Sequence, residues 1–200
     1  TILLMSFWLN YVFGAIVLLY LIMMIGYTYG LKEIVVLDAF IISGGFVLRG
    51  VAGIELIRLY ISPWFLVCGS LLSLFIVFCK RRHEILVLKD KAFAHREILS
   101  QYNVPFLDQL IAIVSSAIIV TYILYTLAPE TVLKFQTRGL LLTVPFVVFG
   151  LFRFLWFVYK KDEGGIAEDI LIKDTVMIVT ILSWLIMVMM VLYWKGFVIP

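Results

Sequence analysis

The side chains best suited to chemistry form one run of charges, Lys80-Arg81-Arg82-His83-Glu84, directly after an apolar stretch. Consecutive basic residues at a helix end can bind phosphate, lysine as a compact charge and arginine as a two-pronged hydrogen-bond donor. The same run would also serve as an ordinary anchor to anionic lipid. Taken alone, the run leaves phosphate binding and membrane anchoring both open.

A second polar group lies at 27–32, where Tyr27, Tyr29 and Lys32 supply two phenols and an ammonium. Interfacial tyrosine and lysine often act only as anchors. We expect this turn on the same side of the membrane as the run at 80–84, and that convergence favours a shared phosphate-binding pocket.

Charged residues also occur inside apolar stretches, where they are expensive and are usually functional. Asp38 and Arg49 share one helical face but lie about 16 Å apart along the axis, so they cannot pair with each other. Each needs a partner helix or a wet cavity, and interhelical salt bridges are the alternative to a functional role. Arg153 could reach the side of the membrane where the run at 80–84 lies, or it could extend its side chain to the membrane–water interface. Asp108 is expected to complement the positive start of a helix opened by Pro105.

The elements that must position these groups follow from the composition. Of the 200 residues, 64% are hydrophobic and only 14% are charged, against about 45–50% and about 25% in soluble domains. Too little polar surface is available to cover a globule in water. The composition therefore indicates a membrane protein and excludes a disordered chain, a coiled coil and a secreted disulfide scaffold.

Apolar stretches of about 20 residues, the length that crosses a bilayer as a helix, predict an all-α transmembrane bundle with one domain over residues 1–200. Strands of a membrane barrel would alternate instead. Residues 1–9 are expected to be the tail of an earlier helix, before a turn at Asn10. The predicted stretches are roughly 10–28, 34–57, 61–79, 106–127, 139–159 and 174–194.

Alternation of these helices across the membrane puts the connections 29–33, 80–104 and 160–173 on one side. Most basic residues outside the helices fall there, which predicts that this side faces the cytoplasm. We therefore expect an integral protein of the inner, cytoplasmic membrane. Nucleic acid is not expected as a partner, because the basic residues lie against a membrane. The sequence contains no P-loop, GxSxG, HExxH or CxxC motif.

Several segments together resemble the UbiA-type membrane prenyltransferases, and more narrowly their decaprenyl-phosphate phosphoribosyltransferase branch. The run KRRHE, in place of a second Asp-rich motif, separates this branch from the aromatic prenyltransferases. The resemblance extends over essentially the whole chain. Its segments are YTYGLK (27–32), VLDAFIISGGFVLRGVAG (36–53), ISPW (61–64), KRRHE (80–84), HREILSQY (95–102), TVPFVVFGLFRFLWFVY (143–159) and GGIAEDILIKD (164–174).

The resemblance implies a nine-helix bundle with a polar cavity that opens to the cytoplasm and sideways to lipid. This chain would correspond to its C-terminal two-thirds, six full helices and the end of another. The family's first Asp-rich motif, which binds Mg²⁺, is absent from this sequence, so no metal ligand is assigned. The chain alone is therefore expected to be inactive.

The implied reaction transfers 5-phosphoribosyl from phosphoribosyl pyrophosphate to a polyprenyl phosphate, releases pyrophosphate and serves cell-wall biosynthesis. The catalytic set expected from it is Lys80, Arg81 and Glu84, with Glu84 orienting Lys80 or binding a ribose hydroxyl. Asp38 and Arg49 would line the cavity, with Arg49 at the acceptor phosphate. The substrate-binding set expected from it is Tyr27, Tyr29, Lys32, Asp38, Arg49, Arg82 and Arg153.

Two other functions remain open from the sequence. One is an aromatic prenyltransferase that uses a polyprenyl diphosphate, which would favour acidic pairs where this chain has KRRHE. The other is a non-enzymatic transport or lipid-binding subunit, which would favour broken helices or related halves. The sequence also leaves association with further copies of the chain open.

Overall fold

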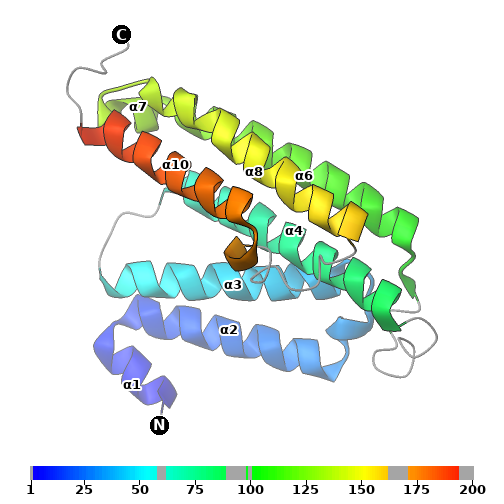
Figure 1. Ribbon diagram of the computed structural model, residues 1–200. Helices are drawn as coiled ribbons and strands as arrows, with labels where there is room; N and C mark the ends of the chain where they lie inside the picture. The colour runs from blue at the N-terminus through cyan, green and yellow to red at the C-terminus, as the bar shows by residue number, and fades with distance from the viewer. Residues whose placement is uncertain (1, 58–61, 89–97, 99–100, 162–170, 194–200) are drawn as a thin grey trace.

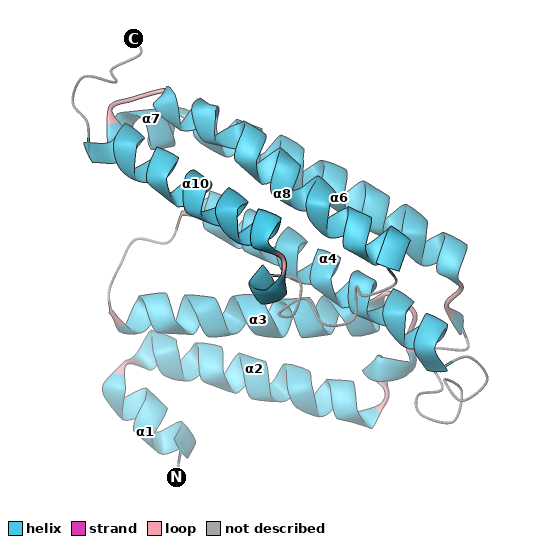
Figure 2. Cartoon of the chain, in the orientation of Figure 1, coloured by secondary structure: helices cyan, strands magenta, loops and turns pink. Residues whose placement is uncertain are grey.

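The apolar stretches form helices, and five of the described helical segments are long and apolar enough to cross a membrane. The computed structural model describes residues 2–57, 62–88, 98, 101–161 and 171–193, and within these ranges it contains helices and no strand (Figure 2). The predicted all-α class is confirmed. The five segments are Tyr11–Tyr29, Leu37–Leu56, Val104–Leu127, Gly139–Lys160 and Thr175–Tyr193.

The described elements follow one another as helices joined by short turns (Figure 1). They are α1 (Ile2–Leu9), α2 (Tyr11–Tyr29), the 3₁₀ turn η1 (Leu31–Glu33), α3 (Leu37–Leu56), α4 (Pro63–Leu88), α6 (Val104–Leu127), α7 (Pro129–Phe135), the 3₁₀ turn η4 (Gly139–Thr143), α8 (Val144–Trp156), the π-helical turn η5 (Phe157–Lys161) and α10 (Thr175–Tyr193).

The starts of α2 and α6 have side-chain caps. The side chain of Asn10 accepts hydrogen bonds from the backbone N–H groups of Val12 and Phe13, so it ends α1 and begins α2, as the sequence predicts. Asn103 caps α6 through the N–H of Phe106, with Pro105 in the first turn. Asparagine is favoured at such positions because its side chain satisfies an N–H that has no partner within the helix.

One prediction of an element boundary was wrong. The connection expected to begin at residue 80 begins later, because α4 continues as one helix through the basic run to Leu88. Successive residues of a helix point about 100° apart. The charges at 80–84 therefore project in different directions from one rod instead of forming a flexible basic loop.

Helix α4 lies at the centre of the bundle, packed against α3 on one side and α6 on the other. Helix α2 covers α3, and α8 packs against both α6 and α10 (Figure 1). The most deeply buried apolar side chains come from α4, α6 and the α8–η5 segment, and include Phe75, Phe78, Leu107, Ile111 and Val158. These side chains pack α4 against α6 and the α8–η5 segment.

Candidate functional site

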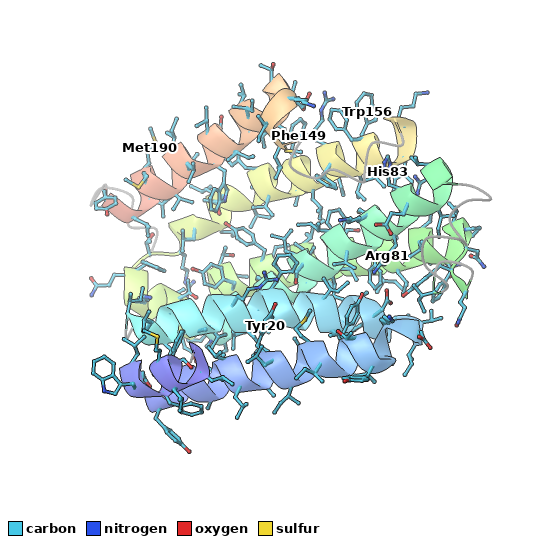
Figure 3. The ribbon with its side chains drawn as sticks, turned by 90° about the horizontal axis from the view of Figure 1, so that it is seen from below. Tyr20, Arg81, His83, Phe149, Trp156 and Met190 are labelled. Carbon is cyan, nitrogen blue, oxygen red and sulfur yellow. The ribbon has the colours of Figure 1, made fainter. Side chains whose placement is uncertain are left out.

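Arg81, near the end of α4, lies in a buried cluster of charges that joins three parts of the chain. Its Nη2 atom is 3.1 Å from Oδ2 of Asp38 at the start of α3, and its Nη1 donates to Oε2 of Glu84 at 2.9 Å. Arg81 is 2% exposed and Asp38 is completely buried. Figure 3 shows Arg81 on α4 beside the start of α3. We call Asp38, Arg81, Glu84 and Tyr102 the Arg81 cluster.

Tyr102, just before α6, completes this cluster. Its hydroxyl donates to Oδ1 of Asp38 at 2.7 Å and accepts the backbone N–H of Val36 at 2.6 Å. Burial and the hydrogen bond to Asp38 raise the pKa of Tyr102 well above its usual range. The phenol therefore stays protonated at neutral pH and donates to the carboxylate. Sequence reasoning missed this residue, which stands at the end of the segment HREILSQY.

The Arg81 guanidinium keeps its charge although it is buried. Burial opposes the charge, but the carboxylates of Asp38 and Glu84 outweigh it and raise the pKa of Arg81; Tyr27 also contributes. Two buried atoms of the cluster, Nε of Arg81 and Oδ2 of Asp38, lack a well-aligned hydrogen bond within the described residues. At 3.1 Å, Oδ2 still faces the guanidinium as an ion pair. The charge interaction therefore dominates this contact.

The backbone beside the cluster is strained at Val36, which has φ 71° and ψ −40°. Positive φ is an outlier for a β-branched residue, and such conformations cost about 1–3 kcal/mol and persist only where neighbours impose them. The hydrogen bond from Val36 to Tyr102 is a contact of this kind. The strained turn lies between η1, which carries Lys32, and the start of α3.

Arg82 belongs to a second buried group on the other side of α4. Its Nε donates to Oδ1 of Asp108 at 2.7 Å and its Nη1 to the backbone carbonyl of Val158 at 2.8 Å. The guanidinium also lies 5.0 Å from the centre of the Tyr159 ring. Arg82 thus links α4 to α6 and η5. The expected role of Asp108 at a helix start is wrong, because Asp108 lies beyond the first turn of α6, which contains no acidic residue, and its partner is Arg82.

Among the described residues, Lys32 on η1 and Lys80 on α4 are exposed cations on elements that adjoin or carry the Arg81 cluster. Within the described ranges, neither ammonium pairs with a carboxylate. Glu84 binds Arg81 and not Lys80, the residue it was expected to orient. Tyr27 is half-buried and close enough to influence the charge of Arg81, whereas Tyr29 is 88% exposed.

Arg49 and Arg153 lie outside this cluster. Arg49 is exposed, donates to the carbonyl of Gly45 within its own helix and lies over the ring of Phe46 at 4.5 Å. Arg153 makes a two-pronged salt bridge to Asp174, at 3.0 and 2.9 Å, which joins α8 to the start of α10. Sequence reasoning did not single out Asp174.

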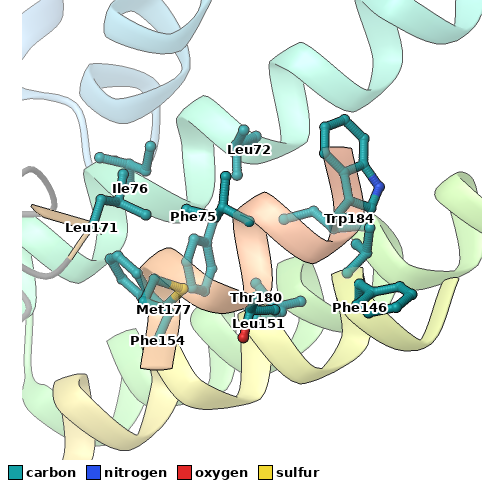
Figure 4. Close-up of a pocket in the computed structure, with 14 residues that line it drawn as sticks. Leu72, Phe75, Ile76, Phe146, Leu151, Phe154, Leu171, Met177, Thr180 and Trp184 are labelled. Carbon is teal, nitrogen blue, oxygen red and sulfur yellow. The ribbon is translucent and has the colours of Figure 1, made fainter. Parts of the chain in front are cut away.

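An apolar pocket of about 270 Å³ opens beside α4, between α8 and α10. Figure 4 shows Leu72, Phe75 and Ile76 of α4 facing side chains of α8 and α10. Lys80 follows Ile76 by four residues, so it lies one helical turn further along the same face of α4. An exposed positive charge and an apolar hollow are therefore neighbours on one helix.

The described residues do not form a metal site, since they contain no group of three or more histidine, cysteine, aspartate or glutamate side chains placed to hold an ion. Parts of three segments of the resemblance, residues 61, 95–97, 99–100 and 164–170, lie outside the described residues.

Comparison with known proteins supports the resemblance found in the motifs. No protein-family model matches the chain. The decaprenyl-phosphate phosphoribosyltransferase of Mycolicibacterium smegmatis is 28% identical over 194 residues, which cover 92% of this chain and 59% of that protein. The enzyme of the same name from Corynebacterium glutamicum is 28% identical over 176 residues, 87% of this chain and 52% of that protein.

A third relative with this name, from Mycobacterium tuberculosis, is 26% identical over 172 residues, 85% of this chain and 55% of that protein. The chain thus spans little more than half the length of the curated relatives it matches. The similarity nevertheless covers most of the chain, including the helices that carry the Arg81 cluster.

Proposed function

We propose that the chain acts in the transfer of 5-phosphoribosyl from phosphoribosyl pyrophosphate to a polyprenyl phosphate of the decaprenyl type. The observation that carries this proposal is the position of Lys80, an exposed cation one turn from an apolar pocket on the same face of α4. A lipid whose isoprenoid units lie in this pocket would bring its phosphate to the end of α4 where Lys80 can hold the anionic donor. The names of the relatives support a phosphoribosyl transfer that involves decaprenyl phosphate, and phosphoribosyl pyrophosphate as the donor is part of the proposal.

The donor half of the reaction needs cations, because negative charge builds on the leaving pyrophosphate. A phosphate oxygen of the lipid attacks C1 of the ribose, the C1–O bond to pyrophosphate breaks, and the bond electrons leave with the pyrophosphate. Fixed positive groups at a developing charge are usually the largest contribution to catalysis. We assign that contact to Lys80 and Lys32, which are exposed, with a further contribution from Tyr27, which is close enough to Arg81 to influence its charge.

Arg81 and Arg82 receive a supporting role in this proposal. Both side chains are buried and already paired, Arg81 with Asp38 and Glu84, and Arg82 with Asp108. A substrate phosphate would have to displace a carboxylate to reach either guanidinium. They instead hold the end of α4 in place, so that Lys80 projects from a fixed helix.

The acceptor half of the reaction uses the apolar pocket. Ligand pockets commonly measure about 300–1,000 Å³, and this one measures about 270 Å³, so it has room for part of a long isoprenoid chain. We propose that the units nearest the phosphate bind there, with the remainder in the bilayer. In this arrangement the Arg81 end of the bundle faces the cytoplasm, which supplies the soluble donor.

A requirement for Mg²⁺ is part of the proposal, and its ligands are not assigned. The described residues offer no cluster of side chains that fits the ion. The ion would neutralise charge on the pyrophosphate when bound.

The experiment is a transfer assay on membranes that contain the protein expressed from its complete gene. Labelled phosphoribosyl pyrophosphate, decaprenyl phosphate and Mg²⁺ should yield a lipid-linked phosphoribose and free pyrophosphate. Addition of EDTA should stop the reaction. Transfer of a prenyl group from a polyprenyl diphosphate to an aromatic acid, with no lipid-linked phosphoribose formed, would refute the proposal.

A further inference from the structure

The hydroxyl of Tyr102 connects two groups that are distant in the sequence. It accepts the N–H of Val36 at 2.6 Å and donates to Oδ1 of Asp38 at 2.7 Å. Tyr102 is 5% exposed and its ring stacks near that of Phe106, with 6.3 Å between the ring centres. The ring is therefore held by packing, while the oxygen is held by two hydrogen bonds to the start of α3.

The turn that this hydroxyl contacts determines how η1 enters α3. Gly30, with φ 150°, ends α2, and η1 follows directly. Only residues 34–36 separate η1 from α3. Val36 holds a positive φ without a side-chain cap, so the strained conformation needs outside support, and the Tyr102 hydroxyl bonds to its N–H group.

The same contact links the turn to α4. Asp38 binds Tyr102 through one carboxylate oxygen and faces Arg81 of α4 through the other. The ends of α2 and α4 and the starts of α3 and α6 meet at this end of the bundle (Figure 1). Val36, in the turn after η1 that carries Lys32, is thus joined through Tyr102 and Asp38 to Arg81, which follows Lys80 in α4.

We propose that Tyr102 is a positioning residue, whose hydroxyl holds the strained turn at Val36 and thereby fixes Lys32 relative to Lys80 for binding of the anionic sugar-phosphate donor. This inference rests on the proposed function. The hydroxyl is the relevant group, because phenylalanine would keep the packing of the ring but leave the Val36 N–H and one oxygen of Asp38 without their partner.

The kinetic test compares Tyr102→Phe, Val36→Gly and the double variant in the transfer assay. Tyr102→Phe should raise KM for phosphoribosyl pyrophosphate at least about tenfold, with KM for the lipid nearly unchanged. Glycine adopts positive φ without steric cost. Adding Val36→Gly to Tyr102→Phe should therefore lower KM for phosphoribosyl pyrophosphate again, by at least about threefold. Tyr159→Phe is the matched control, since its hydroxyl makes only a 3.4 Å contact and its ring contact with Arg82 is kept.

A second measurement reports position without activity. Spin labels at Glu33 and Val87, both exposed, would be introduced in a background lacking Cys68 and Cys79. We expect one narrow distance distribution, broadened by Tyr102→Phe and narrowed again by adding Val36→Gly.

Unchanged donor KM and unchanged distances in Tyr102→Phe would overturn the inference. The inference would also be overturned if Tyr102→Phe raised KM equally for both substrates and Val36→Gly did not reverse the rise. That pattern indicates general damage to the fold. If the wild type transfers no phosphoribose while the distances respond as expected, the proposed function fails and the positioning role of Tyr102 stands.

Discussion

At the scale of single residues, the proposal depends most on Lys80, the exposed cation of the basic run. Lys80→Ala should lower kcat/KM for phosphoribosyl transfer at least about tenfold, about 1.4 kcal/mol of transition-state stabilisation. The reason is that the substitution removes the positive charge that stabilises the leaving pyrophosphate. The transfer assay measures this. Lys134→Ala is the matched control, since Lys134 is also exposed but lies on α7, away from the Arg81 cluster. Equal rates for Lys80→Ala and wild type would remove Lys80 from the mechanism.

The two carboxylates beside Arg81 differ in burial, and their replacement should differ in effect. Asp38 is fully buried, whereas the side chain of Glu84 is 22% exposed. Breaking a buried ion pair from one side costs about 3–5 kcal/mol, because the other charge is left without compensation. Asp38→Asn should therefore lower the thermal midpoint of the purified protein more than Glu84→Gln. The opposite order, measured in the same detergent, would contradict the central place given to Asp38.

The sequence allowed the polar residues to be located but not their partners. A charge such as Asp38 inside an apolar stretch predicts a partner on another helix, and the structure supplies Arg81. Which two of the three consecutive basic residues are buried depends on the rotation of α4 between α3 and α6. That rotation is set by core packing of side chains such as Phe78. Tyr102 gave no signal, because one tyrosine at a helix start has many ordinary roles.

At the scale of elements, the salt bridge between Arg153 and Asp174 holds α8 against the start of α10. Asp174 also accepts the N–H of Met177 at 2.9 Å and so caps α10. Because asparagine caps helices as well as aspartate, Asp174→Asn should remove the charge interaction and keep the cap.

We expect Asp174→Asn and Arg153→Gln each to lower the thermal midpoint. The double variant should lose less than the sum of the two, since both changes remove the same interaction. The measurement is a double-mutant cycle of thermal midpoints. Strict additivity would show that the two residues act independently.

Helix positions followed from apolar length, but two local features did not. The stretch 139–159 was expected as one helix, and it divides into η4, α8 and η5. Pro145 lies in the first turn of α8, where its missing N–H is tolerated, so a boundary nearby is understandable. The positive φ of Val36 contradicts local preference. It depends on Tyr102, which is 66 residues away in the sequence, and no local pattern predicts such a contact.

At the scale of the whole molecule, the bundle combines a polar end with an apolar flank. The Arg81 cluster and the Arg82 contacts join α3, α4, α6 and η5 at one end. The pocket between α4, α8 and α10 lies beside that end and has almost entirely apolar walls. A substrate with a charged head and an isoprenoid chain would contact both regions at once.

This arrangement can be tested by filling the pocket while leaving the polar end intact. Gly150 of α8 lines the pocket, and a Cβ placed there would meet Thr180 at 3.8 Å, an ordinary contact. Gly150→Leu should therefore fold, with the rest of its side chain occupying space proposed for the isoprenoid. KM for decaprenyl phosphate should rise several-fold, and KM for phosphoribosyl pyrophosphate should stay near the wild-type value.

Gly53→Leu is the matched control, because a Cβ at Gly53 on α3 meets no atom within 4 Å and the residue lies outside the pocket. It should leave both KM values unchanged, which separates pocket filling from the general effect of replacing a helical glycine. A short acceptor such as farnesyl phosphate should lose as much affinity in Gly150→Leu as decaprenyl phosphate does, since only the units near the phosphate reach the pocket. If Gly150→Leu left both lipid KM values unchanged, the isoprenoid would have to bind elsewhere on the bundle.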